Sequence, residues 1–406
     1  MKALHILYQS YPNISGSSTR TADILANQKK IGIETVAITS PFQSGIDENN
    51  VEENISGIMH YRTYSGRPNE EVKEDSNNFT VKILKLTRIL FFKKEIFKVV
   101  LKEKPNILHA HAMFFCAYPT IILGKKMNLP VLYEVRSLWE ERRKDSYPRK
   151  FSSVLECFIL RKIETFCIKK ADHIITISEN LKKNLVGRGI PNEKITVVAN
   201  AVDLDFIEKQ AIQMSKRKND SMTFGYVGSV SPIEGLWSLI KLFQTCFRDD
   251  RLLIYGPGKN SEISKLRLLI KDFDNIEYGG VVERDQIYKA YENIDVIVNP
   301  RAKLKITDTV TPLKPLEAMA FDKILIASDV GGLKELIVNN KTGFLFEAEN
   351  LKSLENCISK VKKLPVNELN DIKSRASDFI KNQRNWFINA QTYKELYRRL
   401  SDARKV

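Results

Sequence analysis

The sequence predicts an α/β protein made of two doubly wound domains, each with a parallel sheet covered by helices on both faces. Three observations support this prediction. The chain has 406 residues, too many for one ordinary core and enough for two domains of about 200 residues each. Short apolar runs rich in β-branched residues recur along the chain, and helical periodicity fills most of the gaps between them. The two halves contain the same number of these runs, six each.

The apolar runs give the expected strands in order. In the first half they are residues 4–7, 35–39, 107–110, 131–135, 174–177 and 195–198. In the second half they are residues 223–227, 252–255, 276–278, 296–298, 324–327 and 343–346. We expect an N-terminal domain at 1–199 and a C-terminal domain at 200–383. Ligands of such sheets bind outside the carboxyl ends of the strands, so two sheets that face each other would form one deep cleft.

The composition is that of a globular protein, with 28% charged and 43% hydrophobic residues. No apolar run reaches the roughly 20 residues of a membrane span, and the start, MKALHILYQSYP, is typical of a strand rather than of a signal peptide. The five cysteines are scattered and form no CxxC pair. This pattern favours reduced thiols in a cytoplasmic protein over a disulfide framework or a zinc site.

The most informative segment is residues 299–337. It predicts a strand, a polar loop, a helix that begins near Pro315, a second strand and a glycine turn at Gly331. Lys314 then lies at the start of the helix and Glu317 in its first turn. A helix N-terminus and a lysine favour an anion, whereas a carboxylate accepts hydrogen bonds from hydroxyls such as those of a ribose. A phosphate site beside a diol site indicates a nucleoside diphosphate; the alternative is a capped core helix.

Several motifs carry a resemblance to a known family. TPLKPLEAMA (311–320), ASDVGGLKELI (327–337) and KTGFLF (341–346) resemble the donor-site segment of retaining family 4 glycosyltransferases, which have the GT-B fold. Further similar segments follow the family's order along nearly the full chain. They are GSSTR (16–20), ILHAHA (107–112), YEVRSLWEE (133–141), VVANAVD (197–203), GYVGSVSPIEGLWSLI (225–240), LLIYGPG (252–258) and YGGVVERDQIYKAYENIDV (278–296).

The resemblance implies a hexosyltransferase-type enzyme with two Rossmann-like domains. The donor would bind to the second domain and the acceptor to the first. The last helix, within residues 384–406, would pack back on the N-terminal domain. The resemblance also implies that Glu317 is the second acid of a Glu-x7-Glu pattern, the one that binds the ribose hydroxyls. The first acid of that pattern would stand at position 309, where this chain has Thr309; Asp308, one position away, is the candidate to reach the sugar instead.

A second departure concerns the leaving diphosphate. Many family members place Arg and Lys in the loop that here reads GSVSPIEG, with Ser229 and Glu234 at those places. Negative charge grows on the diphosphate as the sugar–phosphate bond breaks, so cations are still needed. Arg301 and Lys314 are the nearest candidates, and PR before TPLKP resembles one branch of the family. We therefore interpret the cations as relocated. The remaining expected donor contacts are Gly228, Glu234, Thr311 and Leu313.

In the first domain, His109 and His111 lie two apart on one strand, so their side chains share a face. His111 aligns with the histidine that the family places against the donor sugar, whereas His109 is expected to pack below it. A lone strand histidine is otherwise structural. The expected acceptor-side residues come from the glycine-rich first loop and from the end of one strand. They are Gly16, Arg20, Glu134 and Arg136, with Glu140 beyond them.

No metal or cofactor is expected. Asp203 and Asp205 match the DxD pattern of metal-dependent glycosyltransferases, but they stand in an inter-domain segment and are interpreted as a chance match. The family stabilises its leaving group with side chains and helix dipoles, and no metal-ligand cluster is apparent in the sequence. No nucleic-acid-binding module or interleaved aromatic and basic platform is apparent either.

The charge is +15 overall and uneven, because residues 1–200 hold 31 Lys/Arg against 21 Asp/Glu. Between Lys82 and Lys104 there are eight Lys/Arg and two Glu, interleaved with apolar residues. This pattern is typical either of a basic amphipathic helix for an anionic membrane surface or of a helix whose apolar side packs on the first sheet while the lysines are solvated. For the domain as a whole, the positive charge favours attraction to an anionic surface. The enzyme would then be cytoplasmic and peripheral on the inner face of the cytoplasmic membrane.

Together these features predict a retaining, metal-independent glycosyltransferase that moves a sugar from a nucleoside-diphosphate donor to a glycan or lipid-linked acceptor in cell-surface polysaccharide synthesis. Two alternatives stay open. One is a GT-B sugar-nucleotide epimerase or phosphorylase. The other is a catalytically degenerate GT-B subunit that binds an active partner, which Thr309 and Ser229 favour.

Overall fold

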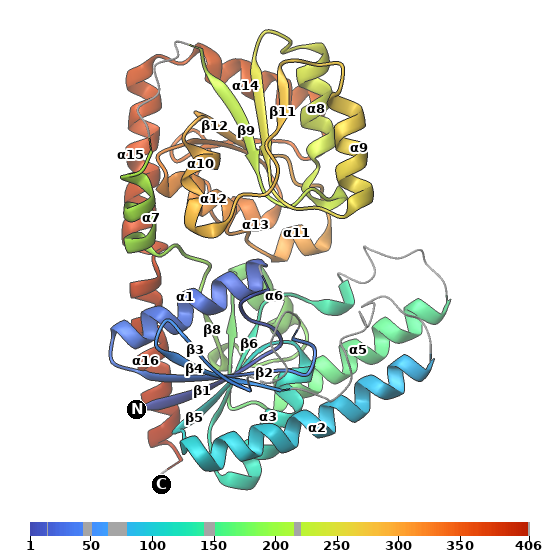
Figure 1. Cartoon of the computed structure of the whole chain (residues 1–406), viewed down its shortest axis with the longest axis vertical. Coiled ribbons are helices and arrows are strands. Elements are labelled where there is room, and N and C mark those ends of the chain that lie inside the picture. Colours follow the sequence, from blue (N-terminus) through green and yellow to red (C-terminus); the bar gives the residue numbers. More distant parts are fainter. Residues whose placement is uncertain (14, 44–50, 64–78, 142–150, 215–220, 405–406) are drawn as a thin grey trace. The chain divides into compact units, whose positions relative to one another are not determined.

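The computed structural model describes residues 1–13, 15–43, 51–63, 79–141, 151–214 and 221–404. They form two compact units, one of residues 1–199 and 386–406 and one of residues 200–385. Each unit is a sheet flanked by helices, as Figure 1 shows. The predicted fold class, two Rossmann-like α/β domains, is confirmed. No helix among the described residues is both long enough and apolar enough to cross a bilayer.

The first unit contains an eight-stranded sheet in the order β3-β4-β2-β1-β5-β6-β7-β8. All neighbouring strands are parallel except the pair β3 and β4. The strands are β1 (Lys2–Leu7), β2 (Glu34–Thr39), β3 (Glu52–Ile55), β4 (Ile58–Arg62), β5 (Ile107–Ala112), β6 (Val131–Val135), β7 (His173–Thr176) and β8 (Ile195–Val197). The helices are α1 (Gly16–Lys30), α2 (Phe79–Glu103), α3 (Phe114–Met127), α5 (Phe151–Lys170), α6 (Glu179–Gly187) and α16 (Trp386–Asp402), with a 3₁₀ turn at Asn192–Lys194.

The hairpin of β3 and β4 was not predicted, so the expectation of six strands in the first half needs correction. Strand β3 is an edge strand with alternating burial and the sequence EENI, which contains no apolar run. Its turn uses Ser56 and Gly57, both with positive φ, as a two-residue hairpin requires. An edge strand of this kind gives no apolar signal because one side of it faces water.

The second unit contains a six-stranded parallel sheet in the order β11-β10-β9-β12-β13-β14. Each predicted strand agrees with the observed one to within one residue at either end. The strands are β9 (Thr223–Val227), β10 (Arg251–Tyr255), β11 (Ile276–Tyr278), β12 (Val296–Asn299), β13 (Ile324–Ser328) and β14 (Phe344–Phe346). A separate apolar core covers each face of the sheet, as expected where side chains alternate between two buried faces.

Several helices of the second unit are short and follow strand ends. All the helices of this unit are α7 (Leu204–Ala211), α8 (Leu236–Thr245), α9 (Asn260–Ile270), α10 (Tyr288–Tyr291), α11 (Lys305–Thr309), α12 (Lys314–Ala320), α13 (Gly331–Lys334), α14 (Leu351–Lys363) and α15 (Val366–Gln383), with 3₁₀ turns at Pro232–Glu234 and Arg284–Gln286, among the described residues. The predicted glycine turn is in fact the first turn of α13. Gly332 lies there because a Cβ atom would come 2.3 Å from the carbonyl oxygen of Val310, which leaves no room for a side chain.

The last helix, α16, packs against α1 and β5 within the first unit. Trp386, Tyr393 and Tyr397 are its largest buried side chains. The indole Nε1 of Trp386 donates a hydrogen bond of 3.1 Å to the carboxylate of Asp23 on α1. Residues 363 positions apart in the sequence therefore share one core, and α16 brings two tyrosine hydroxyls to the middle of the first sheet.

Candidate donor site and a buried charge network

The start of α12 carries the charged pair that the sequence singles out in the second unit. Lys314 is the first residue of the helix, and the residue before it, Leu313, offers no side-chain cap. The Nζ atom of Lys314 lies 2.7 Å from Oε2 of Glu317, and the two side chains are 37% and 18% exposed. The hydroxyl of Tyr291 donates to the same carboxylate oxygen at 3.4 Å. An ion pair that water reaches is weak, so both groups can exchange partners for a ligand.

Arg301 follows β12 and is 6% exposed. Its Nη1 donates to the carbonyl oxygen of Val310 at 3.1 Å, which fixes the guanidinium against the loop after α11. Its Nε lies 3.3 Å from Oε2 of Glu234 without a hydrogen bond of acceptable geometry. Arg301 thus presents a cation with an unsatisfied donor, which suits a second anionic partner. The predicted donor residue Glu234 lies beside it at the end of a 3₁₀ turn.

Asp308 and Thr309 have local roles in the structure. Oδ1 of Asp308 accepts a hydrogen bond of 2.8 Å from the backbone N–H of Gly331, which links α11 to α13. The hydroxyl of Thr309 donates to the carbonyl oxygen of Lys305 within α11. A contact between Asp308 and a sugar therefore has to be compatible with this hydrogen bond or replace it. Where the family pattern has an acid, this chain has a hydroxyl that bonds within its own helix.

Two other predicted donor residues, Thr311 and Gly228, make hydrogen bonds through their backbone. Thr311 is buried, and its carbonyl oxygen accepts from the side-chain amide of Asn200 at 2.5 Å. Gly228 follows β9, and its N–H donates to the carbonyl oxygen of Tyr255 at 3.0 Å. A Cβ atom on Gly228 would lie 2.7 Å from the hydroxyl of Tyr226, so glycine keeps that turn open.

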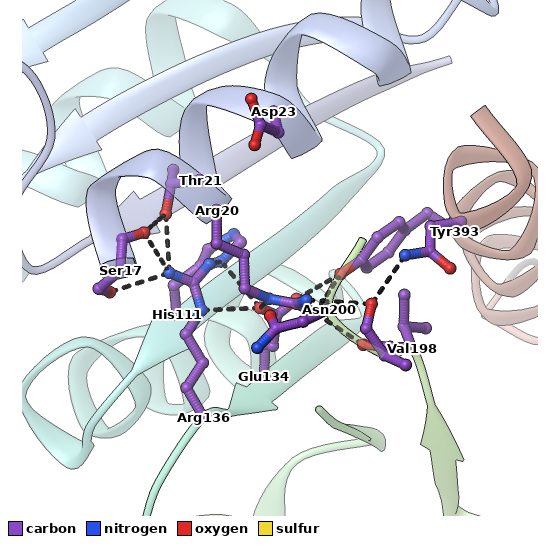
Figure 2. Close-up of polar contacts among 12 residues, drawn as sticks. Ser17, Arg20, Thr21, Asp23, His111, Glu134, Arg136, Val198, Asn200 and Tyr393 are labelled. Carbon is purple, nitrogen blue, oxygen red and sulfur yellow. Dashed lines mark hydrogen bonds and ion pairs between the residues drawn. The ribbon is translucent and has the colours of Figure 1, made fainter. Parts of the chain in front are cut away.

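In the first unit three of the predicted acceptor-side residues, Arg20, Glu134 and Arg136, form one buried charge network, shown in Figure 2. Glu134 lies in β6 and is fully buried. Its Oε1 accepts from Nε of Arg20 at 2.9 Å and from Nε of Arg136 at 2.7 Å, and its Oε2 accepts from the hydroxyl of Tyr393 at 2.5 Å. Burial alone would raise the pKa of Glu134, but the charges of Arg20 and Arg136 outweigh it and hold that pKa well below its usual range.

Both arginines are also held by other groups. Arg20 donates through Nη2 to the carbonyl oxygen of Val198 at 2.8 Å, and its guanidinium lies 4.9 Å from the ring centroid of Trp386. Arg136 donates through Nη1 to the hydroxyl of Thr21 and the carbonyl oxygen of Ser17, both at 2.8 Å. Gly16 is the exposed first residue of α1, not part of a free loop. An acceptor can contact Arg20 or Glu134 only if these groups exchange their present partners.

The hydrogen bonds around His111 fix its protonation. An arginine can only donate, so Nδ1 of His111 accepts from Nη2 of Arg136 at 2.6 Å. Nε2 of His111 therefore carries the proton and donates to Nδ1 of His5 at 2.9 Å. Nε2 of His5 then donates to the side-chain oxygen of Gln28 at 3.1 Å. The amide of Gln28 donates in turn to the hydroxyl of Tyr397 at 3.0 Å.

The same chain of donors ends at His109. The hydroxyl of Tyr397, which accepts from Gln28, is left to donate to Nδ1 of His109 at 2.7 Å. Nε2–H of His109 then points to the carboxylate of Glu134, 3.6 Å away. Burial lowers the pKa values of His5, His109 and His111, in agreement with three neutral rings. His111 is 1% exposed and both of its ring nitrogens are engaged, so it reaches a donor sugar only by exchanging one of these bonds.

This group also corrects the expectation that the chain has no metal-ligand cluster. Ligand atoms of His5, His109 and His111 lie within 4.8 Å of one another. The register of β1 and β5, which places His5 beside His109, creates this cluster, and the sequence does not reveal that register. The arrangement does not fit a metal. His5 and His111 use all four ring nitrogens in the hydrogen-bond chain, and the cation of Arg136 contacts His111 directly.

The opposite face of the first sheet contains a second buried acid, Glu164 of α5. Tyr133 precedes Glu134 in β6, so its side chain points to the other face, where its hydroxyl donates to Oε1 of Glu164. The backbone N–H of Phe114 donates to Oε2 at 3.2 Å. Burial, with a smaller contribution from the charge of Glu140, raises the pKa of Glu164 to about 7. Glu140 itself, predicted near the acceptor, is buried and pairs with Arg188 at 2.6 Å.

Both halves of the chain match glycosyltransferase families. The model for glycosyl transferases group 1 matches residues 208–386, and the model for Glycosyltransferase Family 4 matches residues 14–206. The chain is a glycosyltransferase with the GT-B fold. It is 25% identical over 362 residues to the capsular polysaccharide biosynthesis glycosyltransferase CapM of Staphylococcus aureus, which is 83% of this chain and 88% of CapM.

Two further proteins are similar to this chain. An uncharacterised glycosyltransferase of Methanocaldococcus jannaschii is 21% identical over 258 residues, so the match spans 62% of this glycosyltransferase and 64% of that protein. The crystal structure of HepE from Anabaena in complex with UDP superposes with a TM-score of 0.70 at 14% identity, covering 98% of this chain and 100% of that chain. At this identity the superposition establishes the shared fold.

Glu164 predicts a pH dependence of stability. Its pKa is raised in the folded state, so its contribution to the free energy of unfolding is fully present below the unfolded value near 4.5 and is lost as pH rises to about 7. The loss approaches about 3 kcal/mol. Glu164→Gln abolishes this dependence, because an amide can donate to Tyr133 and accept from Phe114. The variant should therefore be more stable than the wild type at pH 8 and similar to it at pH 5.

Denaturant unfolding at pH 5 and pH 8 tests this prediction. The exposed Glu193→Gln, in the same unit, is the control and should leave the pH dependence as it is in the wild type. A Glu164→Gln variant that loses stability equally at both pH values would show that Glu164 is ionised in the folded protein.

Proposed function

We propose that this glycosyltransferase is a retaining, metal-independent enzyme that transfers a hexosyl group from a nucleoside-diphosphate donor to a glycan or lipid-linked acceptor. The observation that supports this most is the accessible pair of Lys314 and Glu317 at the start of α12. It lies in the half that matches the group 1 glycosyltransferases. A cation and a carboxylate side by side match the two ends of a nucleoside diphosphate, the charged phosphates and the ribose diol.

In the proposed complex Glu317 accepts hydrogen bonds from the ribose hydroxyls, and Lys314 and Arg301 bind the diphosphate. The acceptor oxygen bonds to the anomeric carbon on the face from which the diphosphate departs. The bond between that carbon and the phosphate oxygen breaks, and its electrons stay on the diphosphate. The acceptor proton passes to the leaving phosphate oxygen, so no separate carboxylate base is required. The cations stabilise the growing charge without having to reorganise.

The proposed setting is cell-surface polysaccharide synthesis by an enzyme that is cytoplasmic and peripheral on the membrane. The name of CapM, a capsular polysaccharide biosynthesis glycosyltransferase, supports this setting, since the similarity to CapM extends over most of both chains. The first unit carries most of the positive charge, which favours an acceptor held at an anionic surface.

A second candidate function is a non-catalytic GT-B subunit that binds an active partner. It is favoured by the place of Thr309, whose hydroxyl is bonded to the carbonyl oxygen of Lys305 where the family pattern has an acid. Retention of Arg301, Lys314 and Glu317 opposes it. Transfer or hydrolysis of a nucleotide sugar by the purified chain alone distinguishes the two functions.

The first prediction concerns the diphosphate. Lys314→Ala should lower turnover by about 10² to 10³, the effect of removing one preorganised donor to the leaving group. Arg301→Ala should also lower turnover, because the variant lacks the Nε–H donor that has no hydrogen bond in the wild type. Lys334→Ala removes an exposed lysine of α13 that pairs with Asp329 and is the matched control. Near-normal turnover in both Lys314→Ala and Arg301→Ala, measured with folded variants, would contradict the relocation of the cations.

The second prediction separates the two acids. Glu317→Ala should weaken binding of the nucleoside diphosphate, measured by calorimetry with the nucleotide that gives the largest thermal shift in a panel. Asp308→Ala should change the discrimination between donor sugars. Asp308→Asn keeps an acceptor for the N–H of Gly331 and is the matched variant for the structural role. Unchanged nucleotide affinity in Glu317→Ala would refute its assignment to the ribose.

The third prediction concerns metal ions. Activity should persist in excess EDTA, because side-chain cations take the place of a metal at the diphosphate. The histidine cluster is occupied by its own hydrogen bonds, and Asp203 uses its carboxylate to cap α7 through the N–H of Phe206 at 3.1 Å. Complete loss of activity in EDTA that Mn²⁺ or Mg²⁺ restores would contradict the proposal and return attention to Asp203 and Asp205.

A further inference from the structure

The outward face of α5 exposes large apolar side chains. Val154, Leu155, Phe158, Ile159 and Phe166 are each between 47% and 57% exposed. At 100° per residue they fall on one side of the helix, opposite the buried Cys157, Glu164 and Ile168. A helix of a soluble unit normally turns such residues inward, and an exposed apolar strip of this kind marks an interaction surface.

The same face of α5 is basic. Arg161, Lys162, Lys169 and Lys170 are exposed between and beside the apolar side chains, and the ammonium group of Lys162 lies 5.4 Å from the ring centroid of Phe158. The acidic residues of the described part of this helix lie elsewhere, since Glu164 is buried and Glu156 is half-buried at the edge of the strip. The outward face of α5 therefore carries apolar groups and positive charge without an exposed carboxylate.

Helix α3 extends this surface. It packs beside α5, and its Tyr118 and Ile122 are 38% and 37% exposed. The ring of Tyr118 lies 6.5 Å from that of Phe166, centroid to centroid, which joins the two helices into one apolar area. Lys125 and Lys126, also exposed, stand at the end of α3. Figure 1 shows both helices on the side of the first unit that faces away from α1 and α16.

Helix α2, which contains the basic cluster between Lys82 and Lys104, turns its apolar side inward in its described part. Its apolar residues Ile89, Phe92 and Ile96 are buried in the first unit. Its lysines at 94 and 98 are exposed, while Leu90 and Leu101 are its only large apolar side chains exposed among the described positions. The apolar side of α2 therefore packs inward, and these lysines are solvated. The combination of exposed apolar groups with lysines occurs on α5.

We propose that the α3–α5 face, defined by the exposed residues named above, docks on the surface of an anionic lipid bilayer. Apolar side chains of such a face enter the boundary between headgroups and acyl chains, while the lysines extend to the phosphate groups. A second copy of the chain is a poor occupant, because a symmetric contact would bring the same positive charges together. The proposal deepens the proposed function, since it places the enzyme where a lipid-linked acceptor is found.

The test measures vesicle binding by the full chain, without turnover. The wild type should sediment with vesicles of phosphatidylglycerol and phosphatidylcholine, bind vesicles of phosphatidylcholine alone much less, and be released by salt. Replacement of Lys162, Lys169 and Lys170 by Gln should weaken partition onto the anionic vesicles about 100-fold at low salt. Phe158→Ser combined with Phe166→Ser, which leaves the charge unchanged, should weaken it at least about tenfold.

The matched control removes the same charge from α2, with Lys93, Lys94 and Lys98 each replaced by Gln. Its binding should stay within about threefold of the wild type. A control that loses as much binding as the α5 variants would overturn the proposal, as would equal binding to neutral and anionic vesicles or binding to neither. A wild-type dimer that the Phe158→Ser, Phe166→Ser variant dissociates would also overturn it, because a second copy would then cover the face.

Calorimetry with a nucleoside diphosphate on the same variants keeps the two proposals apart. Normal nucleotide binding together with no vesicle binding would reject only the membrane surface. Normal vesicle binding by a chain that binds no nucleoside diphosphate would reject only the proposed function.

Discussion

A carboxylate that stays ionised inside a protein needs a cation beside it, and the first unit is organised around one such carboxylate, Glu134. Two arginines and a tyrosine hydroxyl surround it, and they come from α1, the end of β6 and α16. These partners hold the last helix against the first one and continue into the chain of histidines. Removing one arginine would leave a buried charge without its full complement, so this cluster has little freedom to bind anything else.

In the second unit the charged side chains are paired less completely and are more accessible to water. Lys314 and Glu317 pair one to one at a helix start and remain partly exposed, and Arg301 keeps one donor without a hydrogen bond. Water already competes for these groups, so a ligand that brings phosphates and hydroxyls can replace the internal partners at small cost. The network around Glu134 is saturated, whereas the pair of Lys314 and Glu317 can exchange partners. This contrast supports the proposal that the donor binds to the second unit. It also indicates that the main role of Arg20 and Glu134 is to stabilise the first unit.

The sequence was sufficient for the features that depend on local patterns. Apolar runs located the strands of the second unit to within one residue, and Pro315 located the start of α12. The features it could not reveal depend on register and on distance along the chain. His5 joins His111 because β1 pairs with β5, Tyr397 joins them from the far end of the sequence, and Glu164 meets Tyr133 across the opposite face. The edge strand β3 was missed because a half-solvated, acidic strand carries no apolar run.

The most direct test of this account is a crystal structure of the full chain with a nucleoside diphosphate selected by its binding affinity. We predict ribose oxygens within hydrogen-bond distance of the Glu317 carboxylate, and phosphate oxygens within the same distance of Lys314 and Arg301, with the ion pair between Lys314 and Glu317 opened. A nucleotide bound elsewhere, with that ion pair and the contact between Arg301 and Glu234 unchanged, would contradict the account.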